Sequence, residues 1–127
     1  MIYDDFIRQV LLATTGCIFA FFALWATLKP KLLATVLGYE LQTRNAISEF
    51  HAIYVGLFLA QALLCVLALT RVEDAVLGNL VSIFLLAQPL GRVIATFRGG
   101  FPSGLLLALF ATEIAGGIIV LLVQPSI

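Results

Sequence analysis

The sequence predicts an all-α polytopic membrane protein, a single domain over residues 1–127 built as a four-transmembrane-helix bundle with a short interfacial helix in loop 1–2. Hydrophobic residues make up 62% of the 127 residues, and Asp, Glu, Lys and Arg only 11%. A soluble domain carries about 25% charged residues, so this chain lacks the charge to cover a water-facing surface. Seven basic residues balance seven acidic ones, which excludes a polybasic nucleic-acid-binding protein.

Four charge-poor stretches mark the predicted transmembrane helices. A spanning helix takes about 20 residues, so four of them leave room for short connections and a fifth would leave almost none. Helices are required because the hydrocarbon core of a bilayer offers no partners to open backbone groups. In chain order, the spans are predicted at about residues 9–28, 47–69, 75–96 and 102–123.

The first span ends at the basic cluster Lys29-Pro30-Lys31, and the connection that follows has a periodicity of its own. Apolar residues recur there at helical spacing with charged residues among them, a pattern typical of a helix that lies in the membrane surface. This pattern predicts the short interfacial helix. Its apolar positions are Leu32, Leu33, Val36, Leu37 and Leu41.

Polar residues bound the remaining spans. Thr43 or Asn45 is expected to cap the second helix, because both residue types accept hydrogen bonds from the first turn. That helix ends before Arg71, and a tight turn leads to the third helix, whose end is marked by Arg92 and Arg98. A second tight turn, rich in glycine, leads to the fourth helix.

Basic residues predict the orientation of the bundle, because loops rich in Lys and Arg stay in the cytoplasm. One side of the membrane receives Arg8 and Arg71. The other side receives four basic residues: Lys29, Lys31, Arg44 and Arg98. We therefore expect loops 1–2 and 3–4 to be cytoplasmic and both termini to lie outside.

A buried ion pair is predicted between the third and fourth spans. Glu113 lies about ten residues into the fourth span, near the bilayer midplane, and the long side chain of Arg92 can reach it. Glu49, on the same leaflet, is a candidate third member. Gly116 and Gly117 are expected to face the third span and leave room for the guanidinium. Such a cluster fixes helix register, binds a ligand or ion, or contacts a partner subunit.

Further polar side chains are expected near this pair. Gln88 lies one turn before Arg92, beside a proline that cannot donate its backbone N–H and so favours a kink. His51 and Tyr54 lie one turn apart near the interface, and Gln61 continues the same helix face inward. The candidate ligand-binding or buried polar cluster is Glu49, His51, Tyr54, Gln88, Arg92 and Glu113.

No catalytic residue, metal site or cofactor is predicted. A lone His without a second His or Cys nearby is weak support for a metal ion. Cys17 and Cys65 lie in separate apolar runs without a C-x-x-C pair, which argues against thiol–disulfide chemistry. No nucleophile–base pair is recognisable, so we expect a protein that is not an enzyme.

Two stripes of small residues recur at a spacing of four. Ala52, Gly56 and Ala60 form the first in the second span, and Ala108, Thr112 and Gly116 form the second in the fourth span. Such stripes let helices approach closely. They are expected to serve packing within the bundle, with an oligomer interface as the alternative.

The polar positions resemble those of a DoxX-like group of small bacterial four-helix membrane proteins of unknown function. The second span opens with Glu49-Phe50-His51-Ala52-Ile53-Tyr54-Val55-Gly56, which resembles the group's E-x-R-x-x-Y-G-G motif. Gly91-Arg92, Gly100-Phe101-Pro102-Ser103 and Glu113 also look like its pattern. The similarity covers about residues 45–120. His51 and Val55 depart from the group's usual Arg and Gly.

This resemblance implies the same fold and a multi-pass protein of the bacterial inner (cytoplasmic) membrane. It singles out Glu49, Tyr54, Arg92 and Glu113 but implies no reaction. We expect an accessory or assembly subunit of a larger membrane complex, or a homo-oligomer. The alternative is a binder or carrier of a small hydrophobic or ionic ligand, a lipid or quinone-like molecule, through the Glu/Arg/Glu cluster.

Overall fold

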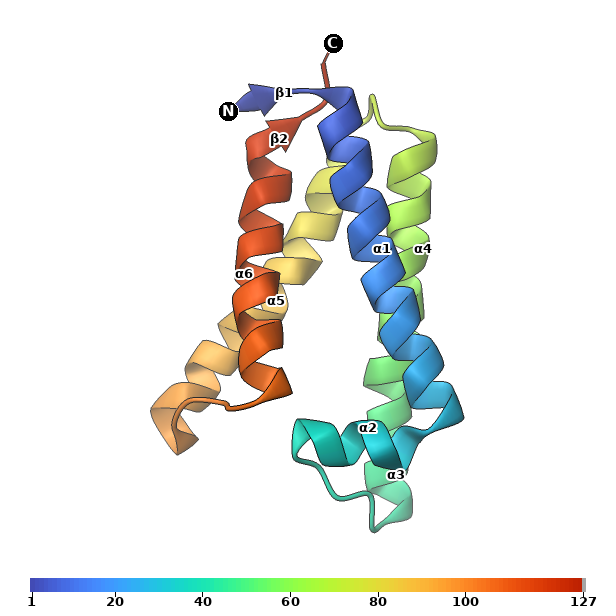
Figure 1. The fold of residues 1–127 in the computed structure, drawn as a ribbon, viewed down its shortest axis with the longest axis vertical. Helices are drawn as coiled ribbons and strands as arrows, with labels where there is room; N and C mark the ends of the chain where they lie inside the picture. The colour runs from blue at the N-terminus through green and yellow to red at the C-terminus, as the bar shows by residue number, and fades with distance from the viewer. Residues whose placement is uncertain (127) are drawn as a thin grey trace.

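The computed structural model describes residues 1–126 and confirms the predicted fold class. Four helical stretches are long and apolar enough to cross a membrane (Figure 1). They are α1 (Asp5–Leu28), a composite second span (Arg44–Thr70), α5 (Ala75–Gly99) and α6 (Leu105–Leu122). The chain is therefore a multi-pass membrane protein.

Helix α1 begins four residues earlier than the predicted span, because Asp4 caps it. The Asp4 carboxylate accepts a hydrogen bond from the backbone N–H of Ile7 at 3.0 Å, as an N-cap does. Arg8 therefore lies inside the first helix, where it is only 1% exposed. This corrects the expectation that Arg8 is a charge flanking the span.

The predicted interfacial helix is α2 (Pro30–Leu37). Pro30 occupies its first position, where a missing N–H costs nothing, and Gly38 ends it with a positive φ of 92°. Leu33 and Leu37 are buried against the bundle, and α2 lies across the lower end of the helices in Figure 1.

The second span is made of α3 (Arg44–His51), a π-helical segment η1 (Ala52–Leu57) and α4 (Phe58–Thr70). Thr43 caps it, accepting from the N–H of Ala46 at 3.0 Å. Phe50, Tyr54 and Phe58 are buried at a repeated spacing of four. That spacing drifts around a helix of 3.6 residues per turn, and the wider π-helical turn keeps the three aromatic rings in line.

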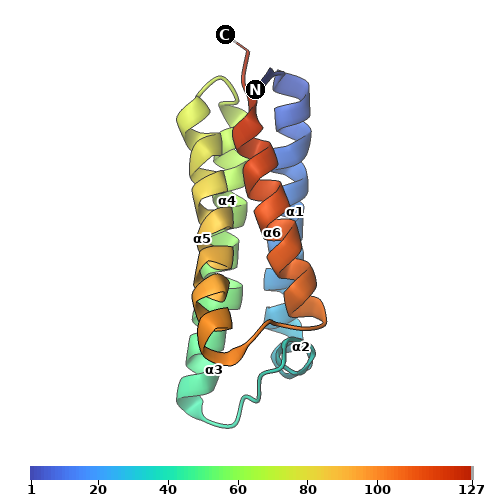
Figure 2. The ribbon, with the colours of Figure 1, turned by 90° about the vertical axis from the view of Figure 1, so that its left-hand side faces the viewer.

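The bundle consists of two helix pairs. Helix α1 packs along α4, and α5 packs along α6, while α4 and α5 join the pairs. In Figure 1 the pair α5/α6 diverges from α1/α4 toward the lower end. Figure 2 shows α3 reaching below the ends of α5 and α6. The core is apolar, and its aromatic rings gather on the α1/α4 side, where the Phe19 and Phe58 centroids lie 5.1 Å apart.

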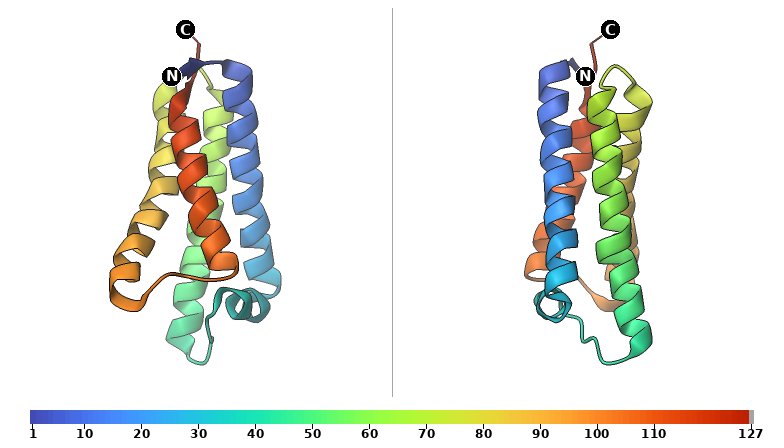
Figure 3. Two further views of the ribbon diagram at one scale, coloured as in Figure 1. Left: turned by 60° about the vertical axis from the view of Figure 1, so that its left-hand side comes forward. Right: turned by 90° about the vertical axis from the view of Figure 1, so that its right-hand side faces the viewer.

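The two ends of the described chain meet. Strand β1 (Ile2–Tyr3) pairs in parallel with β2 (Val123–Gln124), at the end of the bundle that also holds the α4–α5 turn (Figure 3). The contact continues where the Asp5 carboxylate accepts hydrogen bonds from the N–H and hydroxyl of Ser126 at 2.8 and 2.9 Å. The start of α1 is thereby tied to the end of α6.

Candidate functional site

The ion pair between the third and fourth spans is present. Nε of Arg92 lies 3.1 Å from Oε1 of Glu113, and Nη2 lies 3.4 Å from Oε2. The Glu113 side chain is 8% exposed and the Arg92 side chain 18%. Glu113 lies half-way along α6, so the pair sits deep in the membrane-spanning part of the bundle. Its two-pronged geometry is that of an arginine–carboxylate pair.

Glycine near the pair has a different role from the one expected. Gly117 does face α5, but the space between Gly117 and α5 is filled by the Leu86 side chain rather than by the Arg92 guanidinium. A Cβ built on Gly117 would lie 2.6 Å from Cγ of Leu86, far inside van der Waals contact. The glycine therefore allows α5 and α6 to approach closely, and Arg92 reaches Glu113 from one turn after Gln88 on α5.

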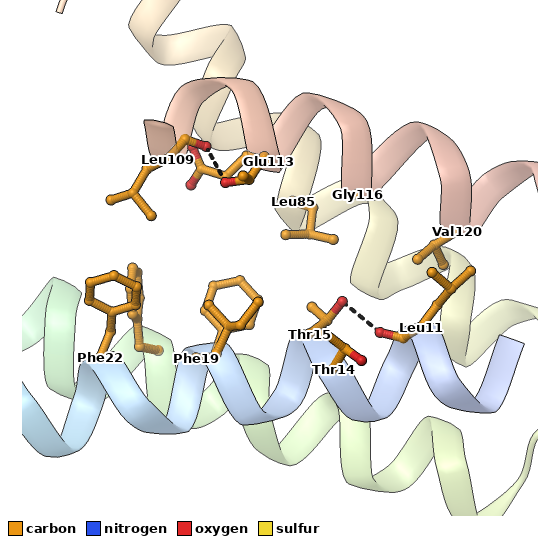
Figure 4. A pocket seen from close by; sticks show the side chains of 13 residues that line it. Leu11, Thr14, Thr15, Phe19, Phe22, Leu85, Leu109, Glu113, Gly116 and Val120 are labelled. Atoms are coloured by element: carbon orange, nitrogen blue, oxygen red, sulfur yellow. Dashed lines mark hydrogen bonds between the residues drawn. The ribbon is translucent and has the colours of Figure 1, made fainter. Parts of the chain in front are cut away.

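One side of the pair borders a cavity of about 190 Å³ between α1 and α6. Phe19 and Phe22 of α1 line it from one side, and Glu113 and Gly116 of α6 from the other, with Leu85 of α5 at the back (Figure 4). Glu113 is the one ionisable side chain among its lining residues in the described chain. The cavity therefore combines an apolar wall with a single carboxylate, which is held by Arg92.

The hydroxyl groups in the wall of this cavity add little polarity. Thr14 and Thr15 each donate a hydrogen bond to the carbonyl four residues earlier, both at 2.8 Å. Thr112 does the same on α6 at 2.9 Å. Because these protons are already engaged by the helix backbone, Glu113 remains the principal polar group that a molecule in the cavity would meet.

The other side of the pair borders a groove of about 460 Å³ between α4 and α5. We call it the α4–α5 groove. Its polar lining residues are Tyr39, Tyr54, Gln61, Gln88 and Arg92. Phe58 lines both the groove and the α1–α6 cavity. The ion pair and Phe58 together separate these two spaces.

Four of the six predicted site residues come together, and two do not. Tyr54, Gln88 and Arg92 line the groove, and Glu113 lies behind Arg92. Glu49 does not join the pair: it is exposed on α3 and borders a separate small pocket beside Tyr39. The reason is that α3 extends the second span beyond the end of α5 (Figure 2), which carries Glu49 away from Arg92.

His51 is also separate from the site. Its Nδ1 lies 2.8 Å from the carbonyl oxygen of Ile47 on its own helix, and its ring meets Phe50 edge to face. Among residues 1–126, no group of three His, Cys, Asp or Glu side chains is placed to hold a metal ion. The interaction of His51 with its own helix is that of an interfacial polar side chain.

The small-residue stripe of the second span faces outward. Ala52, Gly56 and Ala60 are all exposed from the bundle, and a Cβ on Gly56 would meet only the carbonyl oxygen of His51, at 3.8 Å. The expectation that this stripe packs within the bundle is therefore wrong. The π-helical segment sets which face of this span turns inward, and that face carries the aromatic residues.

Arg8 is a buried cation that was expected to flank the first span at its N-terminal end. It donates hydrogen bonds to the carbonyl oxygens of Val120 and Val123, at 3.0 and 2.5 Å, and of Ala75, at 3.1 Å. A further bond runs to Oδ1 of Asn79 at 3.3 Å. The charge lies at the C-terminal end of α6, where the helix dipole favours a cation, and has no carboxylate partner among residues 1–126.

This Arg8 contact joins three helix ends and explains the close packing at Gly78. A Cβ on Gly78 would collide with the guanidinium of Arg8. The signal for it in the sequence was the cap at Asp4, which starts the helix early enough to place Arg8 inside it. Its acceptors could not be anticipated, since Val120 is 112 residues away in the chain.

The chain matches the family described as a domain of unknown function, DUF4345, over residues 7–124. No curated protein and no solved structure matches it. The matched region includes Arg8, the ion pair, and every lining residue of the α1–α6 cavity and the α4–α5 groove. The resemblance to the DoxX-like group stays a prediction. Because the match extends over nearly the whole chain, the protein belongs to the DUF4345 family.

Proposed function

We propose that this protein acts without covalent chemistry and binds a small hydrophobic ligand, a lipid or quinone-like molecule, within the membrane beside the Arg92–Glu113 pair. The α1–α6 cavity carries the proposal. An apolar cavity of about 150 Å³ inside a protein accommodates a benzene ring, and this one measures about 190 Å³. It therefore admits one ring or a short stretch of hydrocarbon chain, with the rest of the ligand in the bilayer.

The architecture supports a ligand that approaches from the membrane. The connections between the last three spans are short, at residues 71–74 and 100–104, so the described chain has no sizeable surface outside the bilayer there. An intramembrane ionisable pair beside a cavity is a functional candidate because its burial is costly. Glu113 would accept a hydrogen bond from the ligand while Arg92 holds its carboxylate in place.

The second candidate function is that of an accessory or assembly subunit of a larger membrane complex, or of a homo-oligomer. It is favoured by the outward stripe of Ala52, Gly56 and Ala60, which no other part of the described bundle covers. Small residues on a lipid-facing helix allow a second helix to approach closely.

For localisation, we propose a bacterial inner membrane with the α2 end of the bundle in the cytoplasm. With Arg8 buried, Arg71 is the remaining basic side chain at the end that carries both termini. The opposite end exposes four basic side chains: Lys29, Lys31, Arg44 and Arg98. This asymmetry supports cytoplasmic α1–α3 and α5–α6 connections and external termini.

Purification from native membranes in a mild detergent tests the two functions. Organic extraction followed by mass spectrometry reports any retained lipid or quinone, and gel analysis of the same sample reports any second protein. A retained small molecule at a fixed molar ratio supports the ligand-binding function. A stoichiometric partner protein supports the subunit function instead, and a bare monomer contradicts both.

A further inference from the structure

The α4–α5 groove contains a polar group that the ion pair does not use. Gln61 is 7% exposed, and its buried side-chain oxygen Oε1 has no hydrogen-bond partner among residues 1–126. Gln61 lies on α4 and lines the groove, together with Gln88 and Arg92 of α5. Buried polar groups are almost always hydrogen-bonded, and the bilayer core offers no solvent partner.

The groove holds a mixed set of donors and acceptors around Gln61. The Arg92 guanidinium bonds Glu113 through Nε and Nη2, and Nη1 has no acceptor among the described residues. The Tyr54 hydroxyl lies 3.4 Å from that of Tyr39. An amide presents a donor or an acceptor according to the rotation of its terminal torsion. A hydroxyl group is the matching head for either orientation, because it both donates and accepts.

Charge balance in the groove disfavours an ionic head. Arg92 is its one permanently charged lining residue in the described chain, and Glu113 already neutralises it at 3.1 Å. An anion would compete with that carboxylate, and a cation would meet the guanidinium without a carboxylate on the groove side. A neutral head neither competes with the Glu113 carboxylate nor is repelled by the Arg92 guanidinium.

The rest of the groove is apolar and continuous with the lipid-facing surface. Ile53, Leu57 and Phe84 line it and are between 40% and 52% exposed from the bundle. A hydrocarbon tail attached to the head would therefore remain in contact with both the groove wall and the bilayer. The space, about 460 Å³, is ample for a head and the first part of a tail.

We propose that the α4–α5 groove binds a neutral amphiphile whose head carries a hydroxyl group, with the Gln61 amide as its hydrogen-bond partner. This site is distinct from the α1–α6 cavity, with which it shares Phe58 as a wall. The Gln88 amide and Nη1 of Arg92 flank the head, and the tail follows the outer faces of α4 and α5.

Photo-crosslinking in phosphatidylcholine nanodiscs tests the proposal, with a diazirine-bearing hexadecanol as the probe. Labelled residues are mapped by mass spectrometry and should include Leu57 and Phe84. Excess hexadecanol should compete with the probe, whereas hexadecyl methyl ether and palmitate should not. Gln61→Leu should lower labelling of these residues about tenfold, the loss expected for one hydrogen bond to a buried amide.

A pair of glycine variants keeps the test independent of Gln61. A Cβ at Gly91 or at Gly99 meets no atom within 4 Å, so both positions accept a larger side chain, but only Gly91 lines the groove. Gly91→Leu should abolish the labelling, and Gly99→Leu should leave it unchanged.

Three outcomes would overturn the proposal. Labelling confined to residues of the α1–α6 cavity would place the amphiphile there, which contradicts this inference but supports the proposed function. Labelling spread evenly over all lipid-facing helices and unaffected by Gln61→Leu would show that the groove binds nothing specifically. Competition by palmitate equal to that by hexadecanol would show that the site does not require a neutral head.

Discussion

The Arg92–Glu113 pair should make a large and coupled contribution to the stability of the bundle. Two unit charges 3.1 Å apart attract each other by about 5 kcal/mol at an effective dielectric constant of about 20. Removing one member of a buried pair costs about 3–5 kcal/mol, because the other charge stays buried without a partner. We therefore expect Arg92→Leu to lower the free energy of unfolding in detergent by about 3–5 kcal/mol.

The two single variants should differ. Glu113 has a short side chain in the middle of α6, and that side chain is 8% exposed. In Arg92→Leu its carboxylate therefore cannot reach the membrane interface. Arg92 has a long stem and lines the α4–α5 groove, so after Glu113→Leu it can extend toward the interface. Glu113→Leu should therefore cost less than Arg92→Leu.

The double variant measures the coupling directly. Replacing both partners by apolar residues removes the stranded charge, so Arg92→Leu/Glu113→Leu should recover most of the stability lost in Arg92→Leu. Arg98→Leu is the matched control, because that arginine lies six positions later on α5 and is exposed. Equilibrium unfolding in a fixed detergent gives the free energy of unfolding of each of these four variants relative to wild type. A double variant as unstable as the sum of the single ones would refute the pairing argument.

Three further predictions concern the rest of the bundle. Arg8→Met should lower the free energy of unfolding by about 3–5 kcal/mol, because it leaves the buried carbonyls at the end of α6 without a donor. Gly78→Ala should also destabilise the bundle, because the new Cβ would collide with the Arg8 guanidinium. Denaturation curves identical to wild type for both variants would contradict the role of this contact. Gly117→Ala should destabilise through its collision with α5, as thermal unfolding would show, and an unchanged melting temperature would contradict the close packing. A cysteine placed at Lys31 should react with a membrane-impermeant thiol reagent only from the cytoplasm, and one placed at Tyr3 only from outside. The reverse pattern would reject the orientation and leave the fold intact.

The spans and the ion pair could be predicted because they depend on local signals. Runs without charge locate membrane helices, and the predicted 75–96 and 102–123 correspond closely to the observed Ala75–Gly99 and Leu105–Leu122. The rise per residue alone places Glu113 mid-membrane. Once alternating topology puts the end of the third span beside the start of the fourth, Arg92 is the nearest cation.

The surroundings of the pair could not be predicted in the same way. Whether Glu49 lies beside Arg92 depends on how far α3 extends past the end of α5, and the extent of that overhang is a tertiary property. The outward turn of the Ala52 stripe depends on the π-helical segment, which a 3.6-residue periodicity does not anticipate. The α1–α6 cavity arises from the divergence of two helix pairs, so no single stretch of sequence encodes it.

The central claim is that the α1–α6 cavity holds a small hydrophobic ligand, and filling the cavity tests it most directly. Gly116 lines the cavity, whereas the neighbouring Ala115 faces outward on the same helix. The measurement is native mass spectrometry of wild type, Gly116→Leu and Ala115→Leu, each released from native membranes. We predict that wild type and Ala115→Leu carry the same bound small molecule and that Gly116→Leu has lost it; equal retention of that molecule by all three proteins would contradict the claim.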